Sequence, residues 1–381
     1  MRILHTSDWH LGKIIYGQSL IEDQRYFIND FLFPLIDEYL PDAIILSGDI
    51  FDRQIAPVEA IRLFDSFVTR LIKEHNTRLI AVTGNHDGAD RLGIGMQLLR
   101  SSEVYITSRL EGDFAPVVLE GKRPIHIYSL PYLDPPAVRD YLGSDEIKSF
   151  EDAYKAVLNI MAEKIDKKAY NILVAHLFVA GSVTSDSESS LFVGGSGEVS
   201  PGVFKEFDYV ALGHLHRAQN HSNICYSGSP LKYSFDEENH KKSVTLLDFG
   251  ESPEPVITQI PVKPLRDMRV VRGSIEEIVK KAETDKNKDD YIFARLEGPL
   301  VFEPMAKLRK VYPNILGITQ TGLTGGEYSL DRSALKEKFH QNNYLSIFEE
   351  FIKQICFDKA TESDVALFNQ ALEELAREDP Q

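Results

Sequence analysis

The sequence predicts an α/β fold over residues 1–250, followed by a small α+β domain and two helices near the end of the chain. Three observations lead to this prediction. Short apolar runs that end in polar residues recur through the first part, amphipathic patterns separate the earliest runs, and the rhythm changes after a proline-rich stretch. Strands that alternate with helices are typical of an α/β core.

Five runs share the strand pattern. Each is short, β-rich and bounded by Gly or polar residues, as expected of strands buried on both faces. Between the first three runs, residues 26–39 and 58–75 carry apolar side chains at three- and four-residue spacing, which predicts two helices. The strand-like runs are 2–10, 42–49, 78–87, 171–176 and 209–216.

Two segments interrupt these patterns. Residues 181–202 are rich in Ser and Gly, and loops of that length inside a compact domain tend to be either functional or disordered. The stretch "PEPVITQIPVKPL" (253–265) repeats Pro and marks a domain boundary. We therefore predict a catalytic domain, an α+β capping domain and a C-terminal helical region, which span residues 1–260, 261–325 and 326–381.

The two later regions have their own patterns. "DMRVVRG", "DYIFARLEG" and "NILGITQT" predict strands, and "SIEEIVKKAE" and "PMAKLRKVY" predict helices. Ser274 and Glu277 have the spacing of a capping box at a helix start. Residues 344–356 and 361–376 predict two amphipathic helices, and Thr361 opens the second with the same spacing. Their apolar faces must dock either on the protein's own body or in a partner's groove.

The composition limits the classes of protein to which the chain can belong. With 43% hydrophobic residues it can bury a core, and no run of ~18 apolar residues predicts a membrane span. Strand-like residues begin at Arg2, so we expect no signal peptide. Cys225 and Cys356 stand alone, which argues against disulfides or thiolate zinc and favours the cytoplasm. With a net charge of −16, any positive surface for nucleic acid must be local or come from a partner.

Polar side chains with metal-binding chemistry gather where the predicted strands end. In an open α/β sheet, sites form at the carboxyl ends of the strands, so these side chains are expected to meet. Asp8 and His10 are two residues apart, as are His214 and His216, so both members of each pair can turn toward one ion. The full set is Asp8, His10, Asp49, Asn85, His86, His176, His214 and His216.

This set predicts a centre with two divalent metal ions. Oxygen and nitrogen donors without Cys suit Mn²⁺ or Fe²⁺ better than structural zinc. Asp49 has two carboxylate oxygens and can bridge two cations, while Asn85 offers a neutral oxygen. Two ions can clamp a phosphodiester and activate water, so no Ser or Cys nucleophile is needed. Because His86 directly follows Asn85, it cannot easily face the same ion, and we predict a general acid or a donor to phosphate.

Neighbouring residues keep more than one interpretation. Taken singly, any member of the set would be a turn residue or a core histidine, and only the set is specific. Asp87 is a candidate to orient His86 from behind. Arg53, in "GDIFDRQ", forms either a local salt bridge or a contact to phosphate, and Asp52 beside it stays unassigned. Trp9 either stacks on a base or supports the metal loop.

The motifs D-x-H, GD, GNHD, a single His after a strand and GH-x-H, in this order over residues 1–250, resemble those of the calcineurin-like metallophosphoesterases. The resemblance implies a four-layer sandwich, with two mixed sheets flanked by helices, and a two-metal site. It also implies the ligands of each ion. One ion takes Asp8, His10, Asp49 and His216, and the other takes Asp49, Asn85, His176 and His214.

Three stretches narrow the resemblance, because "HTSDWHLGK", "ALGHLHRAQ" and "YSGSPLKYSFDE" are similar to the SbcD family of bacterial nuclease subunits. This implies Mn²⁺-dependent cleavage of DNA in repair, recombination and replication, as a 3′→5′ exonuclease on duplex ends and an endonuclease on hairpins and single strands. It also implies a homodimer within a heterotetramer, whose C-terminal helices bind an SbcC-type coiled-coil ATPase. The capping domain would contact DNA, and the cytoplasmic protein would associate with the nucleoid. Archaeal and eukaryotic relatives carry a histidine in place of Asp52, so that histidine's role does not transfer.

Two other classes of function stay open. The same chemistry could serve a phosphoprotein phosphatase or a small-molecule phosphodiesterase, and "GDIFDR" resembles the phosphatase form of its motif. Turnover of a phosphomonoester far above that of DNA would favour this class. Alternatively, the chain could be a scaffold whose terminal helices tether an ATPase. In that case a truncation of residues 340–381 would be harmful and a change at the metal site would not.

Overall fold

The computed structural model describes residues 1–185, 187–188, 197–252, 254–299, 301–320, 344–345, 348, 361 and 363–370. The chain divides into two compact units. The first unit comprises Met1–Arg269 and Asp289–Tyr291, and the second comprises Val270–Lys288 and Ile292–Gln381.

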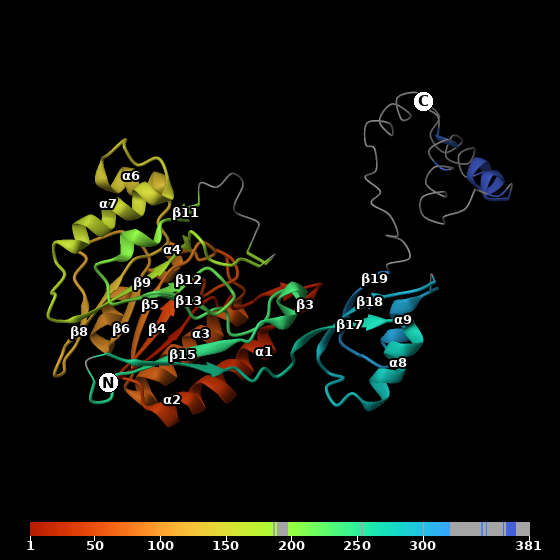
Figure 1. Ribbon diagram of the computed structural model, residues 1–381, viewed down its shortest axis with the longest axis horizontal. Helices are drawn as coiled ribbons and strands as arrows, with labels where there is room; N and C mark the ends of the chain where they lie inside the picture. The colour runs from red at the N-terminus through yellow and green to blue at the C-terminus, as the bar shows by residue number, and fades with distance from the viewer. Residues whose placement is uncertain are drawn as a thin grey trace. The chain divides into compact units, whose positions relative to one another are not determined.

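The first unit is built on two six-stranded mixed sheets (Figure 1). The order of the first sheet is β16 (Val256–Pro261), β15 (Ser243–Asp248), β1 (Arg2–Thr6), β4 (Ala43–Ser47), β5 (Arg78–Val82) and β6 (Val104–Thr107). The order of the second is β13 (Gln219–His221), β14 (Ile224–Tyr226), β12 (Tyr209–Gly213), β9 (Tyr170–His176), β8 (Ile125–Ser129) and β7 (Val117–Leu119). Strands β1, β4, β5 and β6 are parallel, as are β8, β9, β12 and β14.

Alternation of side chains along the strands explains why the sheets stack. In β1, Ile3 lies in the apolar cluster between the two sheets, whereas Leu4 lies in the cluster between the first sheet and its helices. Ile45 and Ile44 of β4 divide in the same way. Because successive side chains point to opposite faces, a strand that is apolar at every position must be covered on both faces. The prediction of doubly buried strands is confirmed.

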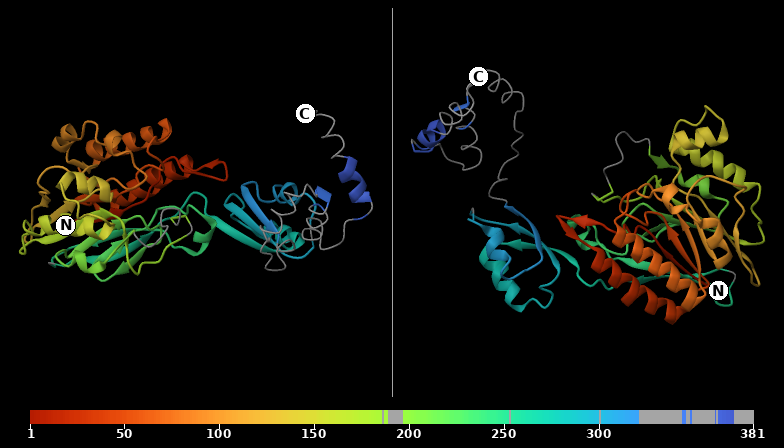
Figure 2. Two further views of the ribbon diagram at one scale, coloured as in Figure 1. Left: turned by 90° about the horizontal axis from the view of Figure 1, so that it is seen from above. Right: turned by 180° about the vertical axis from the view of Figure 1, so that it is seen from behind.

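Helices cover the outer faces of the sheets, which completes the predicted four-layer sandwich (Figure 2). Phe27 and Phe67 pack on the first sheet, and Tyr154 packs on the second. The predicted helices over 26–39 and 58–75 are confirmed, and each contains a π-helical turn, Phe27–Leu32 or Leu71–His75. The α-helices are α1 (Ile21–Tyr26), α2 (Phe33–Tyr39), α3 (Val58–Arg70), α4 (Ala89–Leu92), α5 (Met96–Leu99), α6 (Pro135–Leu142) and α7 (Phe150–Ala162).

Short elements complete the first unit, and one of them is important for the site. The 3-10 helix Phe235–Asn239 follows β14 and is the segment from which Glu237 reaches the interior. The other short elements are the 3-10 helices Arg100–Ser102 and Pro201–Phe204, and the strand pairs β2 (Ile14–Ile15) with β3 (Gln18–Ser19) and β10 (Phe178–Val179) with β11 (Glu198–Val199).

The second unit has a small α+β core. Its sheet has the order β17 (Met268–Gly273), β18 (Tyr291–Leu296) and β19 (Ile315–Gln320), and α8 (Ile275–Thr284) and α9 (Pro304–Leu308) contribute Ile278 and Leu308 to the same core. The predicted capping box is present, because Ser274 Oγ accepts from Glu277 N (3.2 Å) and the Glu277 carboxylate accepts from Ser274 N (2.9 Å).

Most of the predicted region 326–381, with the greater part of both helices, lies outside the described residues. Within the described part, residues 363–370 are helical, and the capping box is present where Thr361 Oγ1 accepts from Asp364 N (3.2 Å). The Phe348 and Phe368 rings stack with their centroids 4.2 Å apart. Among the residues that the structure describes, no helix has the length and apolar character needed to cross a membrane.

Candidate metal centre

Strand ends from both sheets of the first unit converge on one site. Strands β1, β4 and β5 lead into Asp8, Asp49 and Asn85, whereas β9 ends at His176 and β12 leads into His214. Parallel strands present their carboxyl ends at the same edge of a sheet, so each sheet delivers its polar residues to one place. All of these residues except Asn85, which is partly exposed, are buried.

The backbone of the site is strained at the residues that carry its chemistry. Non-glycine residues rarely adopt positive φ, and doing so costs of order 1–3 kcal/mol each. Here φ is +53° at Asp8, +43° at His10, +47° at Asp49 and +102° at His214. The strands' loops hold this geometry together, since His10 N donates to Asp49 O at 2.9 Å. Four of the eleven non-glycine residues with positive φ in the described part of the chain therefore lie at the site, where the fold holds their side chains in place at a cost.

Close approach explains the glycines that precede two of these residues. A Cβ atom on Gly84 would collide with the Asp49 carboxylate, and one on Gly213 would collide with the main-chain oxygen of Ser47. The GN and GH pairs of the motifs therefore allow the loops from different strands to meet closely enough for Asn85 and His214 to share a site.

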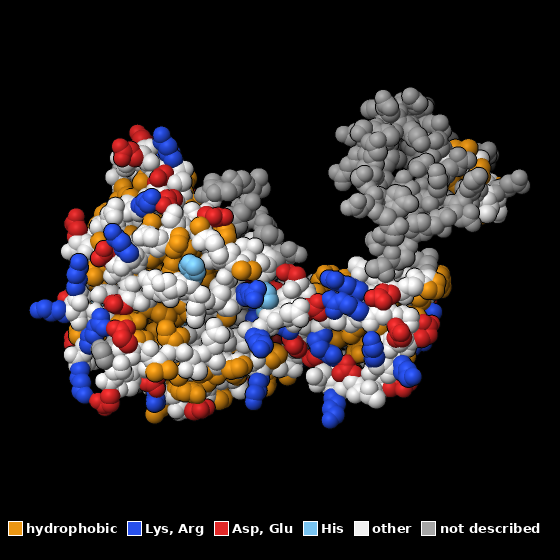
Figure 3. All heavy atoms as spheres, viewed as in Figure 1, with side chains coloured by type: hydrophobic (Ala, Val, Ile, Leu, Met, Phe, Trp, Pro, Cys, Tyr) orange, Lys and Arg blue, Asp and Glu red, His pale blue; other side chains and the backbone are white. Residues whose placement is uncertain are grey.

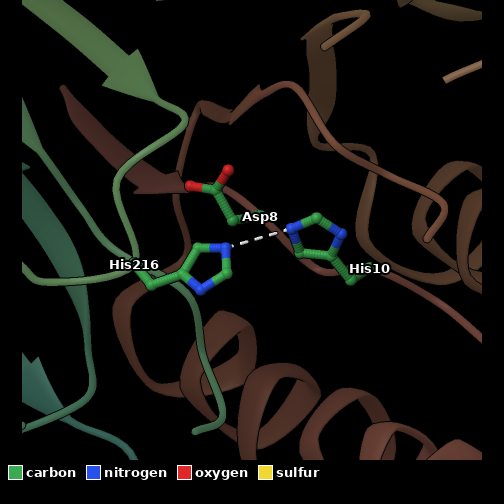
Figure 4. Close-up of side chains that lie close together, drawn as sticks. All are labelled: Asp8, His10 and His216. Atoms are coloured by element: carbon green, nitrogen blue, oxygen red, sulfur yellow. Dashed lines mark hydrogen bonds between the residues drawn. The ribbon is translucent and has the colours of Figure 1, made fainter. Parts of the chain in front are cut away.

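Asp8, His10 and His216 form the first cluster (Figure 4). The Nε2 atoms of His10 and His216 are 3.1 Å apart, and the Asp8 carboxylate lies beside the two rings. Asp8 Oδ1 accepts from His214 N (2.9 Å), whereas Asp8 Oδ2 is buried with no hydrogen-bond partner in the described part of the chain. A buried carboxylate oxygen without a donor, next to two imidazole nitrogens, fits a bound cation.

Asn85, His176 and His214 form the second cluster. Asn85 Oδ1 lies 3.0 Å from His176 Nε2 and 3.1 Å from His214 Nδ1, and these two nitrogens are 3.3 Å apart. Ligands that each lie about 2.1 Å from a single ion have separations of this size. The three donors therefore fit a second cation.

Asp49 joins the two clusters. Its Oδ1 accepts from the main-chain N–H of His86 at 2.9 Å, which fixes the carboxylate. Its Oδ2 lies 3.5 Å from His10 Nε2 in the first cluster and 3.5 Å from His176 Nε2 in the second. The residues therefore fit divalent metal binding.

Each cluster pairs an imidazole of raised pKa with one of lowered pKa. Burial opposes protonation of His176, but the carboxylates of Asp49 and Asp8 and the bond to Ser47 O together outweigh it and raise the pKa to about 9. The pKa of His216 is also raised, because nearby carboxylates overcome its burial. Burial lowers the pKa of His10 well below its usual value and lowers that of His214 to about 3. Since a metal binds neutral imidazole, protonation of His176 and His216 competes with binding of an ion.

His86 lies beside the clusters with one ring nitrogen already committed. Its Nδ1 donates to the main-chain oxygen of Asp52 at 2.9 Å, which leaves Nε2 for another partner. The His86 ring meets the His10 ring edge-on with centroids 4.9 Å apart. One His86 nitrogen also lies within 4.8 Å of ligand atoms of His10 and Asp49. The geometry is compatible with a proton donor or with an additional ligand, and the predicted catalytic role stays a prediction.

Asp87 braces the loops and does not bond to the His86 imidazole. Its carboxylate accepts from the main-chain N–H groups of Ile50 (3.1 Å), Phe51 (2.8 Å) and Gly84 (2.9 Å). Burial raises the pKa of Asp87 to about 7. Any influence of Asp87 on His86 therefore passes through the backbone that it ties together.

Asp52 and Arg53 differ in their surroundings. Asp52 Oδ1 pairs with Lys13 Nζ at 2.9 Å and lies 3.6 Å from His10 Nδ1. Arg53 is exposed, and within the described ranges it has no ion pair or hydrogen bond. The local salt bridge considered for Arg53 is thus absent there, and its guanidinium is available to a ligand.

Trp9 packs into the core beneath the loop. Only 1% of its surface is exposed, its ring meets Phe67 edge-on at 4.9 Å, and its Nε1 donates to Thr6 Oγ1 at 3.0 Å. Trp9 therefore supports the metal loop from behind, and the alternative that it stacks on a base is wrong.

The sequence analysis missed several residues that contact the site. The Tyr233 ring packs edge-on against His10 (5.3 Å) and His216 (5.5 Å), and Glu237 Oε1 lies 3.1 Å from His216 Nδ1. Ser187, in the Ser- and Gly-rich segment, also bonds to His216 at 3.0 Å. No spacing rule marks these residues, because each meets the ligands only through the tertiary fold.

Comparison with known proteins identifies the family of this chain. Residues 1–218 match the family described as calcineurin-like phosphoesterase, and residues 264–355 match one described as the type 5 capsule protein repressor C-terminal domain. The chain belongs to the calcineurin-like phosphoesterase family. It is 35% identical over 366 residues to the D subunit of the nuclease SbcCD from Staphylococcus epidermidis, and the match covers 94% of this chain and 96% of the relative. The predicted fold class and the resemblance to SbcD are confirmed. The solved structure of a dimetal phosphatase from Danio rerio matches 70% of this chain and 98% of its own at 14% identity, with a TM-score of 0.41.

Proposed function

We propose that this protein is the DNA nuclease component of an SbcCD-type complex and hydrolyses phosphodiester bonds with two Mn²⁺ ions. Membership of the phosphoesterase family and the similarity to the D subunit of a nuclease SbcCD support the nuclease activity. One observation carries the two-ion mechanism: Asp49 Oδ2 lies 3.5 Å from a histidine nitrogen of each cluster. The mixture of carboxylate, amide and imidazole donors without Cys favours Mn²⁺.

Different residues of the chain would hold the metal ions, donate a proton and contact the phosphate. The first cluster and Asp49 would hold one ion, and the second cluster and Asp49 would hold the other. Bound divalent ions would neutralise charge on the phosphate and activate water. His86, whose Nδ1 donates to the main-chain oxygen of Asp52, would donate from Nε2 a proton to the leaving oxygen or a hydrogen bond to the phosphate. The exposed Arg53 would contact a neighbouring phosphate.

The nuclease assignment can be tested with defined DNA. Protein purified with its ATPase partner is given ATP, 3′- or 5′-labelled duplexes and a hairpin, with Mn²⁺, Mg²⁺ or a chelator. We expect Mn²⁺-dependent shortening from 3′ ends and opening of the hairpin, which the chelator abolishes. An absence of DNA cleavage would overturn the proposal. Faster turnover of p-nitrophenyl phosphate than of DNA would favour the phosphatase alternative.

We propose that region 326–381 binds the coiled-coil ATPase. The stacked Phe348 and Phe368 rings indicate that the two predicted helices contact each other, and Leu367, 67% exposed, offers apolar surface. Deletion of 340–381 is expected to abolish co-purification with the ATPase but not Mn²⁺ binding. If the deletion inactivates the protein in cells and Asp49→Ala does not, the scaffold alternative is correct.

We propose a homodimer through the segment that contains α4 and α5. Ile94 and Leu98 there are 76% and 79% exposed, and a second copy would remove this apolar surface from water. Leu98→Glu is expected to convert dimer to monomer in sedimentation velocity. Val118→Glu, at an exposed apolar residue elsewhere (37%), is the matched control and should leave the dimer intact.

We propose that the second unit contacts DNA. Figure 3 shows Lys and Arg side chains, interspersed with Asp and Glu, on the visible face of this unit. Replacement of Lys280 and Lys281 by Ala is expected to weaken duplex binding and to reduce its salt dependence. Unchanged binding at low salt would contradict this. Among the described residues of the unit, the exposed basic ones are Arg272, Lys280, Lys281, Lys286, Arg295, Lys307, Arg309 and Lys310.

A further inference from the structure

A buried ion pair lies directly behind the first cluster. Glu237 is fully buried, and its Oε2 pairs with Lys242 Nζ. The Lys242 ammonium also donates to the main-chain oxygen of His216 (2.8 Å) and to Ser229 Oγ (2.7 Å). Burying a carboxylate and an ammonium is costly even when they are paired, and an apolar pair of similar size often stabilises a protein as well. Core stability alone therefore does not explain this pair.

We propose that Glu237 is a positioning residue that prepares His216 to hold a divalent ion. Its Oε1 lies 3.1 Å from His216 Nδ1. A carboxylate only accepts hydrogen bonds, so Nδ1 carries a proton, and in the neutral imidazole that binds a metal Nε2 then keeps its lone pair. Nε2 is the atom that lies 3.1 Å from His10 Nε2 within the first cluster. Glu237 thus selects the tautomer and ring direction that metal binding requires.

Lys242 makes this arrangement rigid. It contacts both the Glu237 carboxylate and the main-chain oxygen of His216, so the acceptor and the backbone of the ligand are tied to one ammonium. The imidazole therefore cannot turn away from the carboxylate without breaking a buried contact.

The Ser- and Gly-rich segment adds a further contact to the pair. Ser187 Oγ donates to Glu237 Oε1 at 2.7 Å and lies 3.0 Å from His216 Nδ1. Glu188 accepts from the main-chain N–H of His216 but lies 4.0 Å from its ring nitrogen. Glu237 is thus the carboxylate that bonds to the ring, and Glu188 is the one that bonds to the backbone.

In the second cluster, among the residues that the structure describes, no carboxylate bonds to the corresponding histidine nitrogen, and the Asp8 carboxylate lies 4.0 Å from it. His176 Nδ1 donates to the main-chain oxygen of Ser47 at 2.9 Å, which selects the same tautomer with a neutral acceptor. Removal of the Glu237 charge should therefore weaken the binding of one ion and leave the binding of the other unchanged.

The inference rests on the proposed two-ion function and is tested on metal binding, without DNA cleavage. Mn²⁺ is titrated calorimetrically into the metal-free full chain of the wild type, Glu237→Gln, Glu237→Gln/Lys242→Met and Glu188→Gln. We expect two ions in the wild type, with one of them bound about 10–100-fold more weakly in both Glu237 variants. The double variant removes both charges and so avoids leaving Lys242 buried and unpaired. Glu188→Gln is the matched comparison, because Glu188 bonds to the backbone of His216 and not to its ring, and it should weaken binding of either ion less than the Glu237 variants do.

The possible results separate the two proposals. Wild-type binding of both ions by the double variant would overturn the positioning role of Glu237 alone. Equal weakening of both ions, loss of the metal-free fold in the double variant, or an equally large effect of Glu188→Gln would also overturn it, because each indicates a general structural role. A wild type that binds fewer than two ions would instead overturn the two-ion function, and this inference with it.

Discussion

The two clusters of the metal centre use the same kinds of ligand but are supported differently. In the first cluster, His216 Nδ1 lies 3.1 Å from a buried carboxylate of Glu237, which comes from a later segment of the chain. In the second, His176 Nδ1 donates to a main-chain oxygen at the end of β4. The first ligand therefore depends on a side chain that mutation can remove, whereas the second depends on the strand itself. A fold can thus supply the same tautomer by side-chain chemistry or by backbone position.

The largest effect is expected where the two clusters share a residue. Asp49→Ala removes the oxygen that lies 3.5 Å from a nitrogen of each cluster, so both ions should be lost and DNA cleavage should become undetectable. Metal content after dialysis, measured by mass spectrometry, checks this. Asp65→Ala, at an exposed position on α3, is the control and should retain both ions. Retention of two ions by Asp49→Ala would contradict the shared role of Asp49, because each cluster would then bind its ion without it.

His86→Ala tests whether a residue beside the clusters belongs to either of them. We expect turnover of DNA to fall about 10²–10⁴-fold, the usual range for an acid–base group, with metal content unchanged. Paired measurements of cleavage rate and bound Mn²⁺ distinguish the roles. A loss of metal would show that His86 is a ligand.

Asn85→Ala tests whether binding of the ion in the second cluster can be weakened separately. Asn85 contributes a neutral oxygen 3.0 Å from His176 Nε2. Its loss should lower the affinity for one ion by about tenfold or more without changing the charge of the site. Combined with Glu237→Gln, the two losses should add in calorimetric titrations, because they act on different ions. Strong non-additivity would mean that the clusters do not respond separately.

The smallest effect on activity is expected from His5, behind the second cluster. Its Nε2 donates to Ser47 Oγ at 3.0 Å, its Nδ1 lies 3.1 Å from Tyr209 Oη, and burial lowers its pKa to about 3. In the unfolded chain His5 takes up a proton near pH 6.5, whereas in the folded protein it stays neutral down to about pH 3. Its contribution to the free energy of unfolding is therefore complete above pH 6.5 and is lost as the pH falls toward 3. The free energy of unfolding should drop by about 2 kcal/mol at pH 5 from this group.

Urea unfolding of the metal-free protein at pH 8 and pH 5 measures this loss. In His5→Gln, the drop between the two pH values should be smaller than in the wild type by about 2 kcal/mol. An identical pH dependence in both proteins would show that His5 is not buried in its neutral form.

Local patterns were sufficient to predict much of this protein. The strands and the helices over 26–39 and 58–75 follow from residue periodicity, and the capping box at Ser274 follows from the spacing of two polar side chains. The convergence of Asp49 with His10 was predictable because parallel strands end at a common edge of one sheet, whereas His176 belongs to the other sheet and meets them through the packing of the two sheets. The chemistry of the motif residues, with Asn and Asp beside His, pointed to divalent ions before any distance was known.

Only the tertiary structure decided how those residues are held. The bonds from Glu237 and Ser187 to His216 join parts of the chain that have no periodic relation, so no pattern in the sequence marks them. The burial of Trp9 depends on Phe67, which a distant helix supplies. The sequence by itself determined which side chains stand at the strand ends, because strand periodicity and motif order are local. The packing of the two sheets and their loops determined which atoms support them, because those contacts exist only after the chain has folded.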